Sequence, residues 1–237
     1  MAENAATAPG TSGTPGGARL TRTLVVVSAG LSQPSSTRLL ADRLTQATVD
    51  RLTEKGVDVT VEVVELRDLA HDITNNLLTG FAAPKLQKAL DALASADGLI
   101  AVTPIFTTSF SGLFKSFVDI IEPTALTDLP VLIAATGGTE RHSLALDYAV
   151  RPLFTYLHAV VAPTAVYAAS SDWGTGSDAA AGALSHSGGG ASALPDRISR
   201  AAGELTALTI ASDRSSRVID PFALPAGFSP VGGYGAQ

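Results

Sequence analysis

Uninterrupted apolar runs divide the sequence into regular elements. Thr23–Ser28, Gly98–Val102 and Leu129–Thr136 each hold apolar residues with almost no polar alternation. Such runs are typical of strands buried on both faces of a sheet. Val57–Val64 alternates partly, which indicates a strand nearer an edge, and Val160–Ala168 is the last predicted strand. The pattern therefore predicts five strands.

Between these runs, apolar residues recur every three or four positions, as on one face of a helix. The first such segment is Arg38–Leu52. We expect Ser35, Ser36 or Thr37 to cap its start with a hydroxyl group, and Gly56 to follow its end. The other predicted helices begin at Pro84 or span Gly112–Ile121, Ser143–Leu157 and Leu194–Ala211.

Three details of this pattern can be checked against a structure. We expect Glu65–Phe81 to be an irregular connection along the surface. Because proline has no N–H group and disfavours helical backbone before it, we expect the Gly98–Val102 strand to stop at Thr103-Pro104. The helix over 143–157 should pack through Leu144, Tyr148, Leu153 and Leu157, and the helix at Pro84 through Leu86, Leu90, Leu93 and Ala94.

Strands and helices alternate five times, which predicts βαβ units and a parallel sheet covered on both sides. Right-handed crossovers leave few arrangements for such a chain. The fold class is α/β, and we expect a flavodoxin-like three-layer sandwich with a five-stranded parallel sheet in the order 2-1-3-4-5. In that order the first and third strands flank the switch point, where open α/β sheets bind ligands.

Composition sets the limits of this domain. Residues 1–20 are mostly small and polar, which predicts a disordered tail. The segment 170–193 is nearly uncharged and suggests a mobile loop, while 213–237 carries spaced aromatics among glycines and prolines and suggests a C-terminal arm. The flavodoxin-like domain is thus expected over 21–212.

The overall composition excludes several functions. The net charge of -6 argues against nucleic-acid binding, and the absence of cysteine excludes disulfides and thiolate chemistry. No apolar run is long enough to span a bilayer, and the start lacks the features of a secretory signal. We expect a cytoplasmic protein with no membrane partner. The histidines lack metal-ligand spacing, no catalytic triad is evident, and no catalytic side chain stands out.

The loop after the first strand, Ser28–Thr37, is rich in hydroxyl groups and opens a helix. Free N–H groups and the helix dipole favour an anion there. Neither GxxxxGK[ST] nor GxGxxG is present, so a terminal monophosphate fits better than a nucleotide chain. The loop is either such a phosphate site or only a capping cluster, and its sequence does not separate the two.

Two further strand ends carry candidate residues. After the third strand, Thr103-Pro104-Ile105-Phe106 offers apolar bulk, and after the fourth, Thr136–Thr139 offers bare backbone at adjacent glycines. Each alone could be an ordinary turn, but successive strand ends of a parallel sheet meet at one edge. The candidate site for a flat apolar ring consists of Ser28, Ser32, Ser35, Ser36, Thr37, Thr103, Pro104, Ile105, Phe106, Thr136, Gly137, Gly138 and Thr139.

These segments resemble a known family. TPIFTTSFSGLFKSFVDI followed by LPVLIAATGGTERHSLALDYAVRPLF is similar to the NAD(P)H-dependent FMN reductases, most of all those that supply reduced flavin to two-component monooxygenases. The resemblance implies hydride transfer from NADPH or NADH to FMN. It also implies that the first-loop serines bind the FMN phosphate, that Pro104–Phe106 lies along the isoalloxazine, and that Thr136–Thr139 closes on the ring. Phe106 stands where many relatives have tyrosine.

Other functions remain open at this stage. The chain could be a quinone or azo reductase that retains its FMN, a flavodoxin-like electron carrier, or a scaffold without flavin. The predicted helix over Gly112–Ile121 is apolar around much of its circumference, which favours oligomerisation. The resemblance implies a homodimer or homotetramer. A flavin-dependent monooxygenase is a further expected partner.

Overall fold

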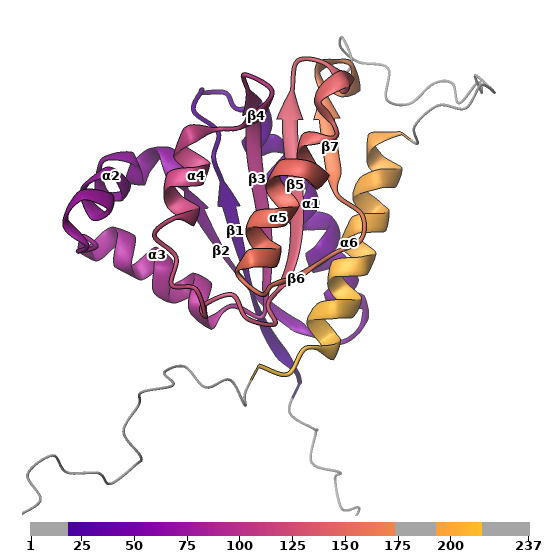
Figure 1. Ribbon diagram of the computed structural model, residues 1–237. Helices are drawn as coiled ribbons and strands as arrows, with labels where there is room; N and C mark the ends of the chain where they lie inside the picture. Colours follow the sequence, from indigo (N-terminus) through magenta and orange to yellow (C-terminus); the bar gives the residue numbers. More distant parts are fainter. Residues whose placement is uncertain (1–18, 174–192, 215–237) are drawn as a thin grey trace, which may run out of the picture.

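The computed structural model describes residues 19–173 and 193–214. Within these residues, seven strands form one sheet with helices on both faces (Figure 1). The strands are β1 (Thr21–Ser28), β2 (Asp58–Glu65), β3 (Gly98–Phe106), β4 (Ser109–Phe110), β5 (Pro130–Gly137), β6 (Val160–Val161) and β7 (Val166–Ala169). The helices are α1 (Ser36–Glu54), α2 (Ala70–Thr79), α3 (Pro84–Ser95), α4 (Gly112–Val118), α5 (Arg151–Tyr156) and α6 (Leu194–Ala211).

The sheet confirms the predicted fold class but not the predicted strand count. Its main path is β2-β1-β3-β5-β6, with β2 at one edge as expected. The predicted fifth strand is split into β6 and β7, both of which pair with β5, and β4 is an additional short strand. All pairings are parallel except that of β4 with β3.

Alternate side chains of the central strands enter two separate cores. Leu24 and Val26 of β1 pack with α1 and α6 on one face of the sheet, whereas Val25 and Val27 pack with the helices of the other face. Successive side chains of a strand point to opposite faces. A strand covered by helices on both faces must therefore be apolar at every position, which explains its uninterrupted apolar run.

The prediction that β3 stops at Thr103 is wrong. The strand continues through Pro104, which is paired with Thr136 of β5, to Phe106. Pairing with β1 ends at Val102, so Pro104 has no partner in β1, and a residue without an N–H group is tolerated there. The chain then turns through Thr107 and Thr108, both with positive φ, into β4, and forms a short hairpin.

The interpretation of Glu65–Phe81 as irregular is also wrong. It contains a 3-10 turn, η1 (Leu66–Leu69), and helix α2. Ile73 is fully buried, together with both leucines that bound η1, whereas Leu78 is 81 % exposed. The buried leucines therefore anchor a regular element, which the mixed polar sequence concealed.

The helix predicted over 143–157 is interrupted. A π-helical turn, η3 (Leu146–Val150), precedes α5. A π turn adds a residue to the helical repeat and so changes which side chains share a face. As a result Leu144 and Tyr148 are exposed, contrary to the prediction, and the buried positions are Leu146, Val150, Phe154 and Leu157.

The apolar circumference of α4 is explained within one chain. Phe114, Phe117, Val118 and the following Ile121 are buried, and Leu113 and Ile120 pack partly against the same core. The apolar side chains of the helix therefore pack within the described part of this chain and leave no open apolar face on it. The inference of an oligomer from this helix is therefore not supported.

The predicted limits of the domain fall mostly outside the residues that the structure describes. The predicted tail, loop and arm lie outside the described residues except at their margins, where Ser170–Trp173 forms a 3-10 turn, η4, and Arg214 donates to backbone carbonyls, including those of Thr127 and Ala125. Across the described ranges, none of the helices is both long and apolar enough to cross a membrane.

Candidate functional site

A pocket of about 440 Å³ lies at the carboxyl ends of the parallel strands, where the loops after β1, β3, β5 and β7 meet. Its volume falls in the range of small-molecule sites, about 300–1,000 Å³. It is lined by Leu31, Ser32, Ser36, Thr37, Pro104, Ile105, Phe106, Thr136, Gly137, Gly138, Ser170 and Trp173.

The start of α1 forms the polar wall of this pocket. The Ser35 hydroxyl caps the helix by accepting from the Arg38 N–H at 3.2 Å. The N–H groups of Ser36 and Thr37 belong to the first turn, which helix geometry leaves without intrahelical acceptors. A Cβ on Gly30 would lie 2.1 Å from the Ser35 hydroxyl, so the absent side chain lets the loop fold against its own cap. The wall therefore presents donors to an anion.

A hydroxyl contact joins this wall to the end of β5. The Thr37 and Thr136 hydroxyl oxygens lie 2.8 Å apart, and both side chains are buried. The pair links residues ninety-nine positions apart, which no local pattern could reveal. It fixes the polar wall relative to the glycine turn that follows β5.

The β3–β4 hairpin forms the apolar wall. Pro104, Ile105 and Phe106 line the pocket, and Phe106 is 48 % exposed at its mouth. Thr103 lies behind them, fully buried, where its hydroxyl accepts from the Ser111 N–H at 3.1 Å. Thr103 therefore holds the hairpin and does not face the pocket.

The turn after β5 brings backbone to the pocket. A Cβ on Gly137 would meet the Tyr167 hydroxyl at 2.0 Å, whereas a Cβ on Gly138 would meet nothing within 4 Å. Tyr167 is 5 % exposed and donates to the Thr139 carbonyl at 2.8 Å. Burial raises the pKa of Tyr167 above its ordinary value, so the hydroxyl stays protonated and keeps this hydrogen bond. Only Gly137 is fixed by packing.

Nine of the thirteen predicted site residues line the pocket, and four do not. Ser35 is the helix cap and Thr103 supports the hairpin. Thr139 caps the 3-10 turn η2 (Glu140–His142). Ser28 is fully buried, and its hydroxyl has no partner among the described residues. The hydroxyls of Ser35, Thr103 and Thr139 thus accept from backbone N–H groups beneath the site, whereas within the described ranges that of Ser28 does not.

Sequence reasoning missed three lining residues, Leu31, Ser170 and Trp173. Leu31 lies in the loop Ser28–Thr37, where only hydroxyl-bearing residues were predicted to contact the ligand. Ser170 and Trp173 follow β7, which pairs with β5, and so reach the same edge of the sheet. The rule that parallel strand ends share one edge could have found them, had the segment after the last strand been included.

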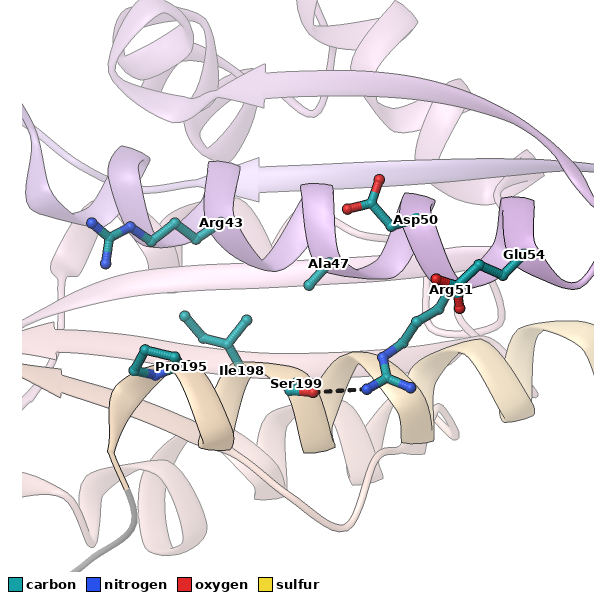
Figure 2. A pocket seen from close by; sticks show the side chains of 8 residues that line it. All are labelled: Arg43, Ala47, Asp50, Arg51, Glu54, Pro195, Ile198 and Ser199. Atoms are coloured by element: carbon teal, nitrogen blue, oxygen red, sulfur yellow. Dashed lines mark hydrogen bonds between the residues drawn. The ribbon is translucent and has the colours of Figure 1, made fainter. Parts of the chain in front are cut away.

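A second groove lies between α1 and α6, away from the strand ends (Figure 2). It is larger, at about 530 Å³, but it is an open channel between two helices. Arg51 spans it and donates to the Ser199 hydroxyl at 2.7 Å. Acidic and basic side chains alternate along its α1 side, so it offers no uniform charge to a ligand. Because open parallel sheets bind ligands at their strand ends, the strand-end pocket is the better candidate site.

Comparisons with known proteins agree on one family. Residues 22–174 match the family model described as NADPH-dependent FMN reductase. The chain is 41% identical over 150 residues to an FMN reductase (NADPH) of Pseudomonas aeruginosa, covering 63% of this chain and 78% of the relative. It is 38% identical over 149 residues to the NADH-dependent FMN reductase SfnE of Pseudomonas putida, covering 63% and 77%.

Solved structures give the same result. An oxidoreductase from Corynebacterium diphtheriae superposes with a TM-score of 0.73 at 43% identity, covering 81% of this chain and 99% of that one. The apo form of the NADH:FMN oxidoreductase EmoB superposes with a TM-score of 0.62 at 27% identity, covering 83% and 94%. The family match spans every loop that builds the pocket, and the chain therefore belongs to the NADPH-dependent FMN reductase family.

Proposed function

We propose that this protein binds FMN in the strand-end pocket and reduces it with NADPH or NADH. The observation that carries the proposal is the pairing of two unlike walls at one sheet edge, hydroxyl groups and free N–H groups on one side and apolar side chains on the other. FMN has the same two parts, a terminal phosphate and a flat ring. The family to which the chain belongs supports this assignment.

The phosphate would bind at the start of α1. Ser32, Ser36 and Thr37 supply hydroxyl groups, and the first-turn N–H groups and the helix dipole favour negative charge. Arg38 is not free to serve as a phosphate ligand, because it donates to Asp42 at 2.7 Å and to Glu65 at 2.5 Å. The hydrogen bond to Glu65, and after it the one to Asp42, raises the pKa of Arg38. The Arg38 charge in turn offsets the negative charge of these carboxylates beside the site.

The ring would lie between the hairpin and the glycine turn. Ile105 and Phe106 offer an apolar surface, and the backbone of Gly137 and Gly138 can approach a flat ligand closely. The phenyl ring of Phe106 can stack on the flavin but offers no hydroxyl group.

FMN supplies the hydride acceptor when bound, and the protein supplies binding, orientation and exclusion of water. The apolar hairpin excludes water from one side of the pocket, and the α1 start orients the ligand by its phosphate. Orientation matters because donor and acceptor must meet at near-contact distance. None of these tasks requires a proton transfer from a side chain.

The experiment is nicotinamide oxidation by the purified protein with and without added FMN. We expect FMN to stimulate the oxidation of NADPH or NADH. The proposal is refuted if FMN, FAD and riboflavin all leave the rate unchanged. Quantifying bound flavin beforehand decides whether FMN is a substrate or a retained cofactor.

We also propose that the product is passed to a flavin-dependent monooxygenase in the cytoplasm, because the resemblance is to reductases of two-component systems. A homodimer or homotetramer is part of this proposal. Its support is the family resemblance, because the apolar side chains of α4 are buried within this chain. Light scattering on the purified protein measures the oligomeric state, and a monomer at working concentration would contradict it.

A further inference from the structure

The turn after β7 is fixed in place by an ion pair with α6. In η4, the Asp172 carboxylate accepts from the Ala169 N–H at 2.8 Å and from the Arg197 guanidinium. Arg197 also donates to the Tyr167 carbonyl. The Asp172 and Arg197 side chains are only 17% and 21% exposed. A partly buried ion pair thus holds this four-residue turn against the end of β7.

What this turn presents to the pocket is Ser170 and the indole of Trp173. Trp173 is partly buried and packs against the core under α1 and α6. On α1, the Arg43 guanidinium lies 5.1 Å from the centre of the indole ring. A further contact, from the Ser171 hydroxyl to Glu140 at 3.0 Å, ties the turn to the segment after the glycine turn. The indole is therefore held from several sides.

We propose that Trp173 is a contact residue for the bound flavin nucleotide and that Asp172 and Arg197 are positioning residues for it. This proposal rests on the proposed function, and it adds a wall from the loop after β7 to the walls from the other strand ends. An indole has the large flat surface that stacks on or borders an aromatic ligand. Asp172 and Arg197 do not line the pocket themselves, and their ion pair holds the turn that carries the indole.

Arg43 gives the indole a second property. A cation held near an aromatic ring is attracted to it, and the contact fixes both groups. Arg43 itself lines the groove between α1 and α6, so it contacts the indole from the side of that groove.

The test is isothermal titration of the flavin-free protein with FMN, run beside thermal unfolding of each variant without FMN. Trp173→Ala should raise the Kd for FMN at least about fivefold, the lower end of what one aromatic stacking contact contributes. Trp173→Phe should retain most of the affinity. Asp172→Asn, which keeps the shape but weakens the clamp, should raise the Kd about two- to tenfold, as expected for loss of a hydrogen bond.

The matched control is Arg51→Gln. Arg51 lies on the same helix as Arg43 and joins α1 to α6, but it lines the helix–helix groove and not the pocket (Figure 2). We expect its Kd for FMN to equal that of the wild type. If Trp173→Ala binds FMN as the wild type does, the contact is refuted. If Trp173→Ala weakens FMN binding but Asp172→Asn binds FMN as the wild type does, the positioning role is refuted.

Stability effects are separated by the unfolding data. If Trp173→Ala and Arg51→Gln raise the Kd for FMN equally and both lower the unfolding midpoint, the cause is general destabilisation and the proposal is overturned. Should Asp172→Asn fail to fold, Arg197→Lys tests the same clamp with the charge retained. Wild-type protein that binds no FMN at all would refute the proposed function itself, an outcome distinct from loss of binding in the Trp173 variants only.

Discussion

Substituting Gly137 by alanine tests whether the turn after β5 is fixed by packing against Tyr167. The added Cβ would lie 2.0 Å from the Tyr167 hydroxyl and 3.0 Å from the ring carbon that carries it. Gly137 does not have a positive φ, so alanine fits its backbone and the collision is the only penalty. The ring cannot move freely, because it is 5 % exposed and its hydroxyl donates to the Thr139 carbonyl at 2.8 Å.

The cost follows from the size of the overlap. Relieving it requires a shift of more than 1 Å between two packed groups, roughly the difference from ordinary contact. Overpacking of this kind lowers the free energy of unfolding by about 1–3 kcal/mol. For a chain of this size, each kcal/mol corresponds to about 2–4 °C in the unfolding midpoint. Because Gly137 also lines the pocket, the affinity for FMN should fall as well.

A double-mutant cycle isolates the contact. Tyr167→Phe removes the hydroxyl group and one hydrogen bond, at a cost of about 0.5–1.5 kcal/mol. In that background the collision with oxygen is gone and only the ring carbon at 3.0 Å remains, so Gly137→Ala should cost less by about 1 kcal/mol. Urea unfolding of the four proteins measures the interaction energy.

Gly138→Ala is the matched control. Its Cβ would meet nothing within 4 Å, so the free energy of unfolding should not fall. Additive effects of Gly137→Ala and Tyr167→Phe, or equal stability of the two alanine variants, would refute the reasoning that Tyr167 is what fixes Gly137.

Three further predictions concern the walls of the pocket and pH. Gly30→Ala should displace the Ser35 cap, which its Cβ would approach to 2.1 Å, and so cost about 1 kcal/mol in urea unfolding and weaken FMN binding; a variant with wild-type values for both would contradict this. Ile105→Asp should abolish FMN binding in titration calorimetry while circular dichroism stays unchanged, because a carboxylate would face an apolar ring; tight binding would place the ring elsewhere. Burial raises the pKa of Tyr167 in the folded state, so its contribution to stability is complete below the unfolded pKa of about 10 and is lost as pH rises through the folded pKa. The free energy of unfolding of Tyr167→Phe should therefore fall less steeply above about pH 10 than that of the wild type. Parallel pH curves for the two proteins would contradict this prediction.

Local patterns in the sequence were sufficient for much of the fold. Helix α6 begins and ends where the apolar spacing predicted, and the cap of α1 is Ser35, one of the three predicted alternatives. Such features depend on neighbours along the chain, through periodicity and the needs of a helix end. The same locality explains the failure at Tyr148, since a π turn changes the face of a helix without leaving a mark in the apolar spacing.

What the sequence determined by itself was the parallel core of the sheet and the edge at which its loops meet. That edge gave the polar wall, the hairpin and the glycine turn, because parallel strands that alternate with helices must end on the same side. Tertiary structure alone decided which residues line the pocket. Ser28 and Thr103 are buried beneath it, while Trp173 is brought to it by the pairing of β7 with β5 and by the Asp172–Arg197 pair. The physical reason is distance along the chain: the hydroxyl contact between Thr37 and Thr136 and the ion pair at Asp172 form only once the sheet and helices have packed.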